Sequence, residues 1–206
     1  MAILSLALIG YLLGCVNGSQ IIGKMKNIDI GNKGYKNPGA SNTTLLLGWK
    51  YGVIVALIDI GKAMIPLIYL KLYYANDPFQ IAILYLTGLF IIIGHNYPIT
   101  MKFKGGKGTA SIIGMIFAIN WKIGLFCIGI LLLIGVISDY FVIGVWGMYL
   151  SFVGSTGFSY GFLSLQMTIA LIIMSLSTIK HIENYRRILE KKEIRVSKLI
   201  KDKFAL

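Results

Sequence analysis

Charged side chains are scarce in this 206-residue sequence, and acidic ones are scarcer still. Charged residues make up 14% of the chain, and 8 Asp and Glu residues stand against 20 Lys and Arg residues. Hydrophobic residues make up 56%, whereas an ordinary soluble domain has roughly 45–50%. This balance argues against a soluble domain and favours a membrane protein whose positive charge is concentrated in a few loops.

Cysteine and histidine are also rare, with two residues of each. Cys15 and Cys127 both fall inside apolar stretches, so we interpret them as small buried side chains. Their spacing is not typical of a disulfide framework or of a metal site. We therefore expect neither a metal nor a cofactor.

Long apolar runs are abundant. A helix needs about 20 residues to cross a bilayer, so the runs predict an all-α, polytopic membrane protein with about seven transmembrane helices. Two of them, 109–120 and 123–138, are short for a span, and we expect tilt, local thinning of the membrane, or a neighbouring loop that dips into it. The seven expected segments are residues 3–23, 45–70, 79–94, 109–120, 123–138, 140–157 and 161–179.

Lys and Arg residues gather in the loops 24–44 and 95–108 and in the tail from residue 180, while the turns between them hold few. Because basic loops usually face the cytoplasm, we expect both loops and the C-terminus inside the cell and the N-terminus outside. The turn near Asp139 departs from this pattern, since it should be cytoplasmic and carries no basic residue.

The stretch 94–109 combines a histidine with lysines and glycines between two apolar segments. Glycines expose backbone N–H groups, lysines add positive charge, and a helix that begins after the stretch would add its N-terminus, so we expect phosphate or acyl-phosphate binding. A nucleotide-binding P-loop is excluded, because Met101 stands where its first glycine would be and Gly108 follows the lysine. The alternative is a loop that is basic only because it is cytoplasmic. The candidate residues are His95, Lys104, Gly105, Gly106, Lys107, Gly108 and Thr109.

Loop 29–44 is dense in Gly, Asn, Ser and Thr. It fits ordinary turn chemistry, or a set of uncharged hydrogen-bond donors for a phosphate or a hydroxyl. Within the second apolar segment, Asp59 and Lys62 are three residues apart, so they share a helix face and can pair. A structural pair and a direct role in function are both open for them.

Near the start of the tail, His181 and Asn184 are also three apart and would share a helix face below the membrane. Residues 188–206 mix basic and apolar side chains. We interpret them as a basic amphipathic cytoplasmic tail that lies on anionic lipid, following a single integral-membrane domain over residues 1–187.

These three polar segments resemble, in order, the three cytoplasmic motifs of the acyl-phosphate-dependent glycerol-3-phosphate acyltransferases, the PlsY family. The match is best over Gly94–Ser111 and extends to Asp59-Ile-Gly-Lys62. The resemblance implies a cofactor-free enzyme of the bacterial inner membrane with its active site on the cytoplasmic side. Such an enzyme moves a fatty acyl group from acyl-phosphate to glycerol 3-phosphate, releasing lysophosphatidic acid and phosphate.

The resemblance also implies that Lys107, His181 and Asn184 line the substrate site. Chemically, Asn184 can orient the attacking hydroxyl or the developing oxyanion, and His181 can position the acceptor or act as a base. Glu183 is expected to hold the tail helix in place, and Asp59 and Lys62 to be structural.

The first motif departs from the family pattern, because Tyr35 replaces a serine and Leu45 replaces an arginine. Lys36 could restore one of the lost charges, although a lysine does not bind phosphate in the bidentate manner of an arginine. A family member with another acceptor therefore stays open, as does a non-catalytic membrane protein or anion transporter. The remaining candidates for substrate binding in this loop are Lys36, Asn37, Gly39, Ser41 and Asn42.

Overall fold

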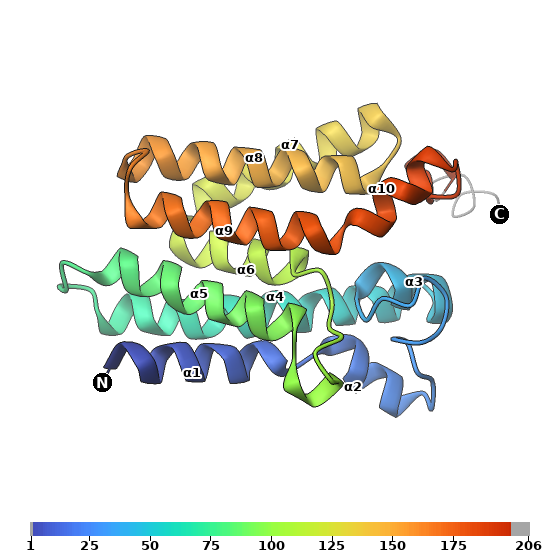
Figure 1. The fold of residues 1–206 in the computed structure, drawn as a ribbon, viewed down its shortest axis with the longest axis horizontal. Coiled ribbons are helices and arrows are strands. Elements are labelled where there is room, and N and C mark those ends of the chain that lie inside the picture. The colour runs from blue at the N-terminus through green and yellow to red at the C-terminus, as the bar shows by residue number, and fades with distance from the viewer. Residues whose placement is uncertain (1, 199–206) are drawn as a thin grey trace. The chain divides into compact units, whose positions relative to one another are not determined.

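The structure is a computed structural model, and it describes residues 2–198. All regular secondary structure in this range is helical, and the helices form two compact units that divide after Ile119 (Figure 1). The all-α expectation is confirmed, and each unit has its own set of helices.

Unit 1 is a bundle built around three long helices. The first apolar segment is broken at Asn17, whose carboxamide oxygen accepts the N–H groups of Ser19 and Gln20 and so starts a second helix. The elements of unit 1 are α1 (Ala2–Cys15), α2 (Gly18–Met25), α3 (Ala40–Leu47), α4 (Trp49–Tyr73), α5 (Gln80–Asn96), the 3-10 helix η1 (Ile99–Met101) and α6 (Thr109–Ile119).

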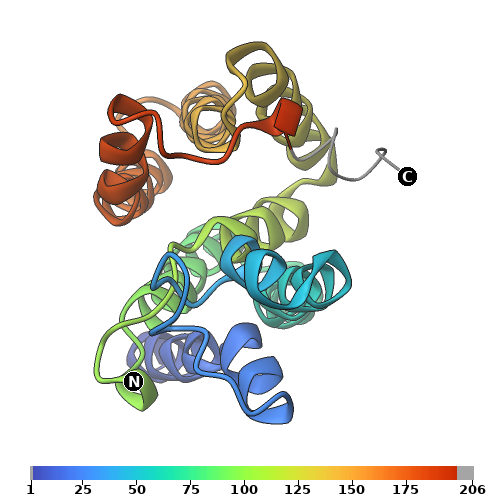
Figure 2. The same cartoon turned by 90° about the vertical axis from the view of Figure 1, so that its right-hand side faces the viewer.

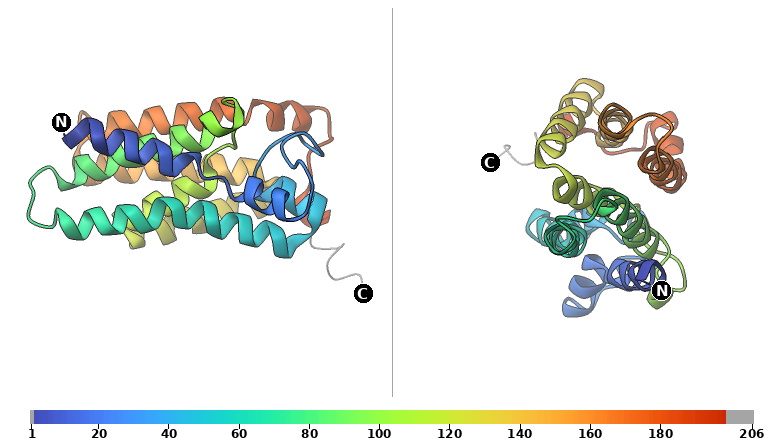
Figure 3. Two further views of the ribbon diagram at one scale, coloured as in Figure 1. Left: turned by 90° about the horizontal axis from the view of Figure 1, so that it is seen from below. Right: turned by 90° about the vertical axis from the view of Figure 1, so that its left-hand side faces the viewer.

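Small residues let these helices approach closely. A Cβ on Gly14 of α1 would lie 2.2 Å from the carbonyl oxygen of Ile91, and one on Gly94 of α5 would lie 2.1 Å from that of Tyr11. Packing of this kind is common between membrane helices, where lipid supplies no hydrophobic driving force for association. It sets α1 directly against the end of α5 from which the glycine–lysine loop leaves (Figure 3, left).

Unit 2 is a helical bundle that ends in a bent segment. Asn120 and Ser164 cap the starts of two helices with their side-chain oxygens, and a bend of 49° separates the last two helices (Figure 2). The elements are α7 (Trp121–Ser138), α8 (Phe141–Tyr160), α9 (Leu165–Lys180) and α10 (Ile182–Leu189).

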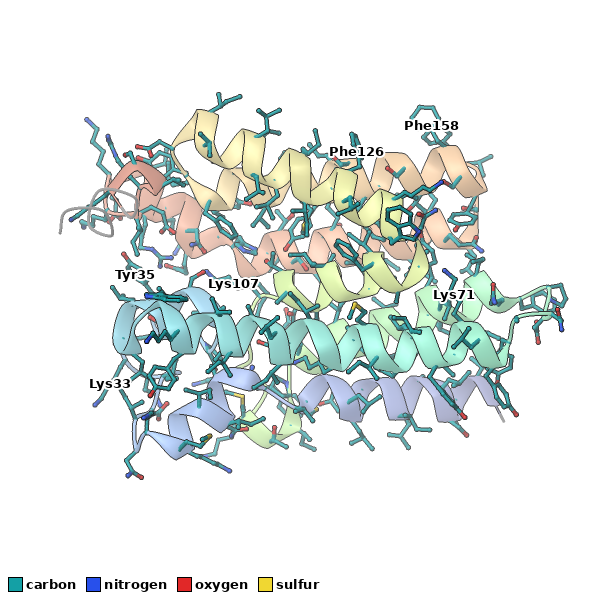
Figure 4. All side chains as sticks on the ribbon, turned by 180° about the vertical axis from the view of Figure 1, so that it is seen from behind. Lys33, Tyr35, Lys71, Lys107, Phe126 and Phe158 are labelled. Atoms are coloured by element: carbon teal, nitrogen blue, oxygen red, sulfur yellow. The ribbon has the colours of Figure 1, made fainter. Side chains whose placement is uncertain are left out.

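By length and apolarity, five stretches in the described residues could cross a membrane, or six if α9 and α10 are one bent span. Each of the seven expected segments contains a helix, but α6 has only 11 residues, which is too short for a straight span. Unit 2 carries large apolar side chains on its surface, among them Phe126 and Phe158, which are 55% and 85% exposed. Figure 4 shows both pointing outward. The chain is therefore a multi-pass membrane protein with five or six candidate spans.

Helix α10 does not continue through the amphipathic tail that we expect over residues 188–206, although residues 196–198 are again helical. Helix α10 ends at Leu189, and Lys191 adopts a left-handed conformation with φ of 57°. The N–H of Lys191 then bonds to the carbonyl of Ile188, and that of Lys192 to the carbonyl of Arg187, which is the Schellman way of ending a helix. The chain turns back on α10 instead of continuing, and residues 199–206 of the expected tail lie outside the described range.

Candidate active site

The glycine–lysine loop, residues 102–108, joins α5 to α6 in unit 1. Helix α6 begins at Thr109, as the sequence predicts. Gly108, the residue before it, has a φ of 85°, a backbone conformation that glycine adopts without strain and that residues with a side chain rarely adopt. The N–H of Gly105 bonds to the carbonyl of Asn96, and the N–H of Gly106 to that of His95. These two amides therefore shape the loop and are not directed at a ligand, which leaves the loop's phosphate-binding capacity to Lys107 and the first turn of α6.

A buried cluster of charged and titratable side chains, formed by Asp59, Lys62 and His95, lies next to this loop. The Lys62 ammonium lies 3.1 Å from Asp59 Oδ1 and 2.7 Å from His95 Nδ1, and it also donates to the carbonyls of Gly14 and Val16. All three charged or titratable side chains are at most 5% exposed. The expected pairing of Asp59 with Lys62 is present, and it extends to a histidine that the sequence had placed only in the loop.

The contact with Lys62 fixes which nitrogen of His95 carries the proton. An ammonium group has donors and no acceptor, so Nδ1 of His95 accepts, and the ring proton of the neutral imidazole is on Nε2. The Nε2 atom faces Gly106, where an added Cβ would lie 2.2 Å from it. His95 is thus a hydrogen-bond donor that points at the loop.

The first polar segment meets the glycine–lysine loop at Pro38, whose carbonyl oxygen would lie 2.9 Å from a Cβ on Gly106. Asn42, which is 1% exposed, accepts from the N–H of Tyr35 and donates to the carbonyls of Ile30 and Lys33. Its carboxamide therefore holds the loop in shape, and the motif position that we expected to bind substrate has an evident structural task.

The other candidates in this segment lie nearer the surface. Gly39 is the residue before α3, and Ser41 is exposed in the first turn of that helix. Lys36 is exposed in a left-handed turn, and Asn37 is half-buried beside it. In Figure 4, Tyr35 lies with Lys33 at one end of unit 1, and Lys71 lies toward the opposite end of α4.

The lysines of the glycine–lysine loop differ in exposure. Lys104 is exposed, whereas Lys107 is half-buried and makes a contact within the protein. The Leu45 side chain, which stands where the family has an arginine, is 49% exposed. In Figure 4, Lys107 lies on the same side of unit 1 as Lys33 and Tyr35, away from Lys71.

The second histidine, in unit 2, has the opposite tautomer. His181 lies at the bend between α9 and α10, is 4% exposed, and its Nδ1 is 2.7 Å from the carbonyl oxygen of Ser177. A carbonyl only accepts, so Nδ1 carries the proton and Nε2 is the acceptor nitrogen of the neutral ring. This is the arrangement that a histidine base requires.

Asn184, three residues on, is 9% exposed, and its Nδ2 donates to Glu193 Oε1 at 2.7 Å. The other oxygen of the same carboxylate accepts from Arg187 Nε, also at 2.7 Å. Glu183, which we expected to hold the tail helix, lies 3.1 Å from Arg186 in a pair whose side chains are about two-thirds exposed. Glu193 makes the contacts between tail and helix that the sequence had suggested for Glu183.

Sequence reasoning missed two residues. Glu193 lies nine positions beyond Asn184, and no helical spacing connects the two. Asn96 is fully buried, and both its carboxamide atoms lack a hydrogen-bond partner among the described residues. An added Cβ on Gly108 would lie 2.8 Å from Asn96 Oδ1. Only its place beside His95 in the motif could have drawn attention to it.

Comparisons with known proteins identify the family of the chain. The model of the glycerol-3-phosphate acyltransferase family matches residues 4–191. Glycerol-3-phosphate acyltransferase 1 of Oceanobacillus iheyensis is 49% identical over 94% of both chains. The glycerol-3-phosphate acyltransferase of Aquifex aeolicus is 34% identical over 95% of this chain and 100% of its own.

Solved structures are similar as well. The crystal structure of PlsY, an integral membrane glycerol 3-phosphate acyltransferase, in its glycerol 3-phosphate form superposes with a TM-score of 0.85 at 32% identity, covering 95% of this chain and 96% of that one. The lysophosphatidic acid form gives 0.83, covering 95% of each chain. Fold and site thus define an integral-membrane acyltransferase. The chain belongs to the glycerol-3-phosphate acyltransferase family, whose members act in phospholipid synthesis.

Proposed function

We propose that this chain transfers a fatty acyl group from an acyl-phosphate to the hydroxyl of glycerol 3-phosphate, giving lysophosphatidic acid and inorganic phosphate. The observation that carries the proposal is the glycine–lysine loop at the start of α6, backed by the donor nitrogen of His95, within a chain 49% identical to a named glycerol-3-phosphate acyltransferase. One solved relative is described in a glycerol 3-phosphate form and again in a lysophosphatidic acid form, which are the acceptor and the product of this reaction.

An acyl-phosphate is a mixed anhydride and is already activated, so the reaction needs no covalent enzyme nucleophile. In this proposal the attacking hydroxyl loses its proton, the C–O bond to the acyl carbon forms, and phosphate leaves with the electron pair of the broken bond. Lys107 and the N-terminus of α6 hold phosphate oxygens. Asn184 orients the hydroxyl, and Nε2 of His181 can take its proton.

We further propose that the catalytic side faces the cytoplasm of a bacterial cell, that the N-terminus is outside and that seven segments cross or enter the membrane. Two observations support this arrangement. In unit 1, Lys33 and Lys107, one from each lysine-rich loop, lie on the same side, away from Lys71 (Figure 4). In unit 2, Arg195 of the tail lies 4.0 Å from Asp139, so the turn that lacks basic residues in the sequence is paired with a basic residue.

The test is incubation of the purified protein with palmitoyl-phosphate and glycerol 3-phosphate while phosphate release is followed. We expect release that depends on the acceptor, with a lysophosphatidic acid formed in equal amount. The matched variant is Asn184→Ala, which should lose the acceptor-dependent rate. Absence of acceptor-dependent release in folded wild-type protein would refute the proposal.

A second candidate acceptor follows from a difference between this chain and the family pattern. In the first motif Leu45 replaces the arginine, and its apolar side chain is 49% exposed. A different polyol phosphate or an uncharged alcohol would need that arginine less than glycerol 3-phosphate does. The same assay run with a panel of acceptors distinguishes the two candidates by their kcat/KM values.

A further inference from the structure

The tail that follows α10 folds back and contacts the carboxamide of Asn184, which we propose takes part in the reaction. We propose that Glu193 is a positioning residue that fixes the orientation of the Asn184 side chain. The inference rests on the proposed function, because it concerns how Asn184 meets the acceptor hydroxyl.

Backbone geometry brings Glu193 to this place. Because Lys191 is left-handed, the N–H of Lys192 reaches the Arg187 carbonyl at 2.7 Å, and the N–H of Glu193 reaches the same oxygen at 3.1 Å. The carbonyl groups at the end of α10 thereby gain partners, as helix ends require. Glu193 is thus held by its main chain before its side chain makes any contact.

A second attachment lies three to four residues after Glu193 in the same segment. Asp139, in the turn between α7 and α8, accepts from the N–H of Ser197 at 2.7 Å and from its hydroxyl at 2.9 Å. The carbonyl of Asp139 accepts from the N–H of Val196. The segment 190–197 therefore forms a strap that is fixed at both ends, with Glu193 at the end attached to α10.

The chemistry of the carboxylate decides the orientation of the amide. An Asn side chain can turn its oxygen or its nitrogen toward a neighbour, and the two atoms are told apart by the partners they meet. A carboxylate can only accept, so the side of Asn184 that faces Glu193 is Nδ2, and Oδ1 points away from the strap. This orientation directs an acceptor oxygen away from the strap, and it favours the role in which Asn184 binds a hydroxyl group of the acceptor substrate over the role in which it donates to an oxyanion.

Arg187 makes the carboxylate necessary at this position. Glu193 has two acceptor oxygens and satisfies Asn184 with one and Arg187 with the other. A glutamine would have a single oxygen. Since hydrogen bonds from a charged donor are the stronger ones, Arg187 would take that oxygen, and the glutamine NH₂ would face Asn184 and reverse its amide.

The test uses the full-length protein in the phosphate-release assay. We expect Glu193→Gln to lower kcat by about 2- to 10-fold, the effect of losing one hydrogen bond between uncharged groups, with KM for both substrates near the wild-type value. The matched control is Glu190→Gln, because Glu190 is an exposed carboxylate of the same segment that pairs with Lys192. It should keep the wild-type kcat.

Two further variants separate orientation from loss of structure. Glu193→Gln combined with Arg187→Met should regain activity, since the glutamine oxygen is then available to Asn184. Arg187→Met alone should keep kcat, because the carboxylate still faces Nδ2, and this variant carries the test if Glu193→Gln does not fold. If Glu193→Gln behaves like Glu190→Gln, or if Arg187→Met lowers kcat as much as Glu193→Gln does, the inference is overturned. An inactive wild type, or an Asn184→Ala variant as active as wild type, would instead overturn the proposed function beneath it.

Discussion

Gly106→Ala is the sharpest probe of the loop in unit 1. An added Cβ would lie 2.2 Å from His95 Nε2 and 2.9 Å from the carbonyl oxygen of Pro38. His95 is 3% exposed and is held by Lys62 at 2.7 Å, so its ring cannot turn aside without breaking a buried contact. Protein atoms therefore already occupy the space that a Cβ at this position would need.

The expected size of the effect follows from this crowding. Forcing one extra carbon into a packed site costs about 1–3 kcal/mol. In a chain of 150–250 residues each 1 kcal/mol shifts the melting temperature by about 2–4 °C. We expect Gly106→Ala to lower the melting temperature by several degrees and to raise KM for a phosphate-bearing substrate, because relief of the clash displaces the loop that carries Lys107.

The assay pairs thermal unfolding in detergent with phosphate-release kinetics. The control is Gly129→Ala in α7, where a Cβ would meet nothing within 4 Å. His95→Asn shortens the opposing side chain but also removes the contact with Lys62, so it should cost less stability in the Gly106→Ala variant than in wild type, and a double-mutant cycle measures that coupling. Equal melting temperatures and equal KM values for Gly106→Ala and Gly129→Ala would refute the reasoning.

Three other perturbations test separate parts of the chain. Lys62→Met should destabilise the protein by about 3–5 kcal/mol, since it leaves Asp59 buried without its cation, and Asp59→Asn with Lys62→Met should recover part of that loss in a denaturation series. Tyr35→Ser with Leu45→Arg should lower KM for glycerol 3-phosphate by roughly 10- to 100-fold at similar kcat, and an unchanged KM would show that these positions do not face the acceptor. The hydrogen bond from the Ser197 backbone N–H holds the pKa of Asp139 below its usual value, so its contribution to tail docking is complete above about pH 4, the pKa of an unfolded Asp. It is lost as the pH falls through the lower folded value, and hydrogen exchange at residues 195–198 should rise there in wild type and at neutral pH in Asp139→Asn.

Much of the fold could be read from the sequence, because lipid imposes simple rules on composition. Apolar runs and basic loops predict all-helical membrane structure, and each expected segment contains a helix. The lengths of the spans were harder to predict. The runs do not reveal that Asn17 breaks the first helix, or that α6 stops after 11 residues. Those events depend on side-chain capping and close glycine contacts that hydropathy does not record.

The candidate site was predicted less completely. The motif residues were found, but the contacts that fix their chemistry come from distant or unpatterned positions. Lys62 reaches His95 across 33 residues, and Glu193 reaches Asn184 from the tail, which was expected to lie on lipid. The sequence pointed to Glu183 because it lies within a motif, whereas the acceptor that binds Asn184 arises only because Lys191 reverses the chain.

The two histidines show why composition could not assign roles. As letters in a motif they are equivalent, and each is almost fully buried. Lys62 donates to Nδ1 of His95, so that ring presents an N–H to the glycine–lysine loop, while the Ser177 carbonyl accepts from Nδ1 of His181 and makes Nε2 an acceptor. A loop that holds phosphate needs donors, and a hydroxyl that attacks a carbonyl carbon needs an acceptor for its proton. The neighbours of each ring, and not the histidine itself, therefore decide that His95 suits anion binding and His181 suits proton transfer.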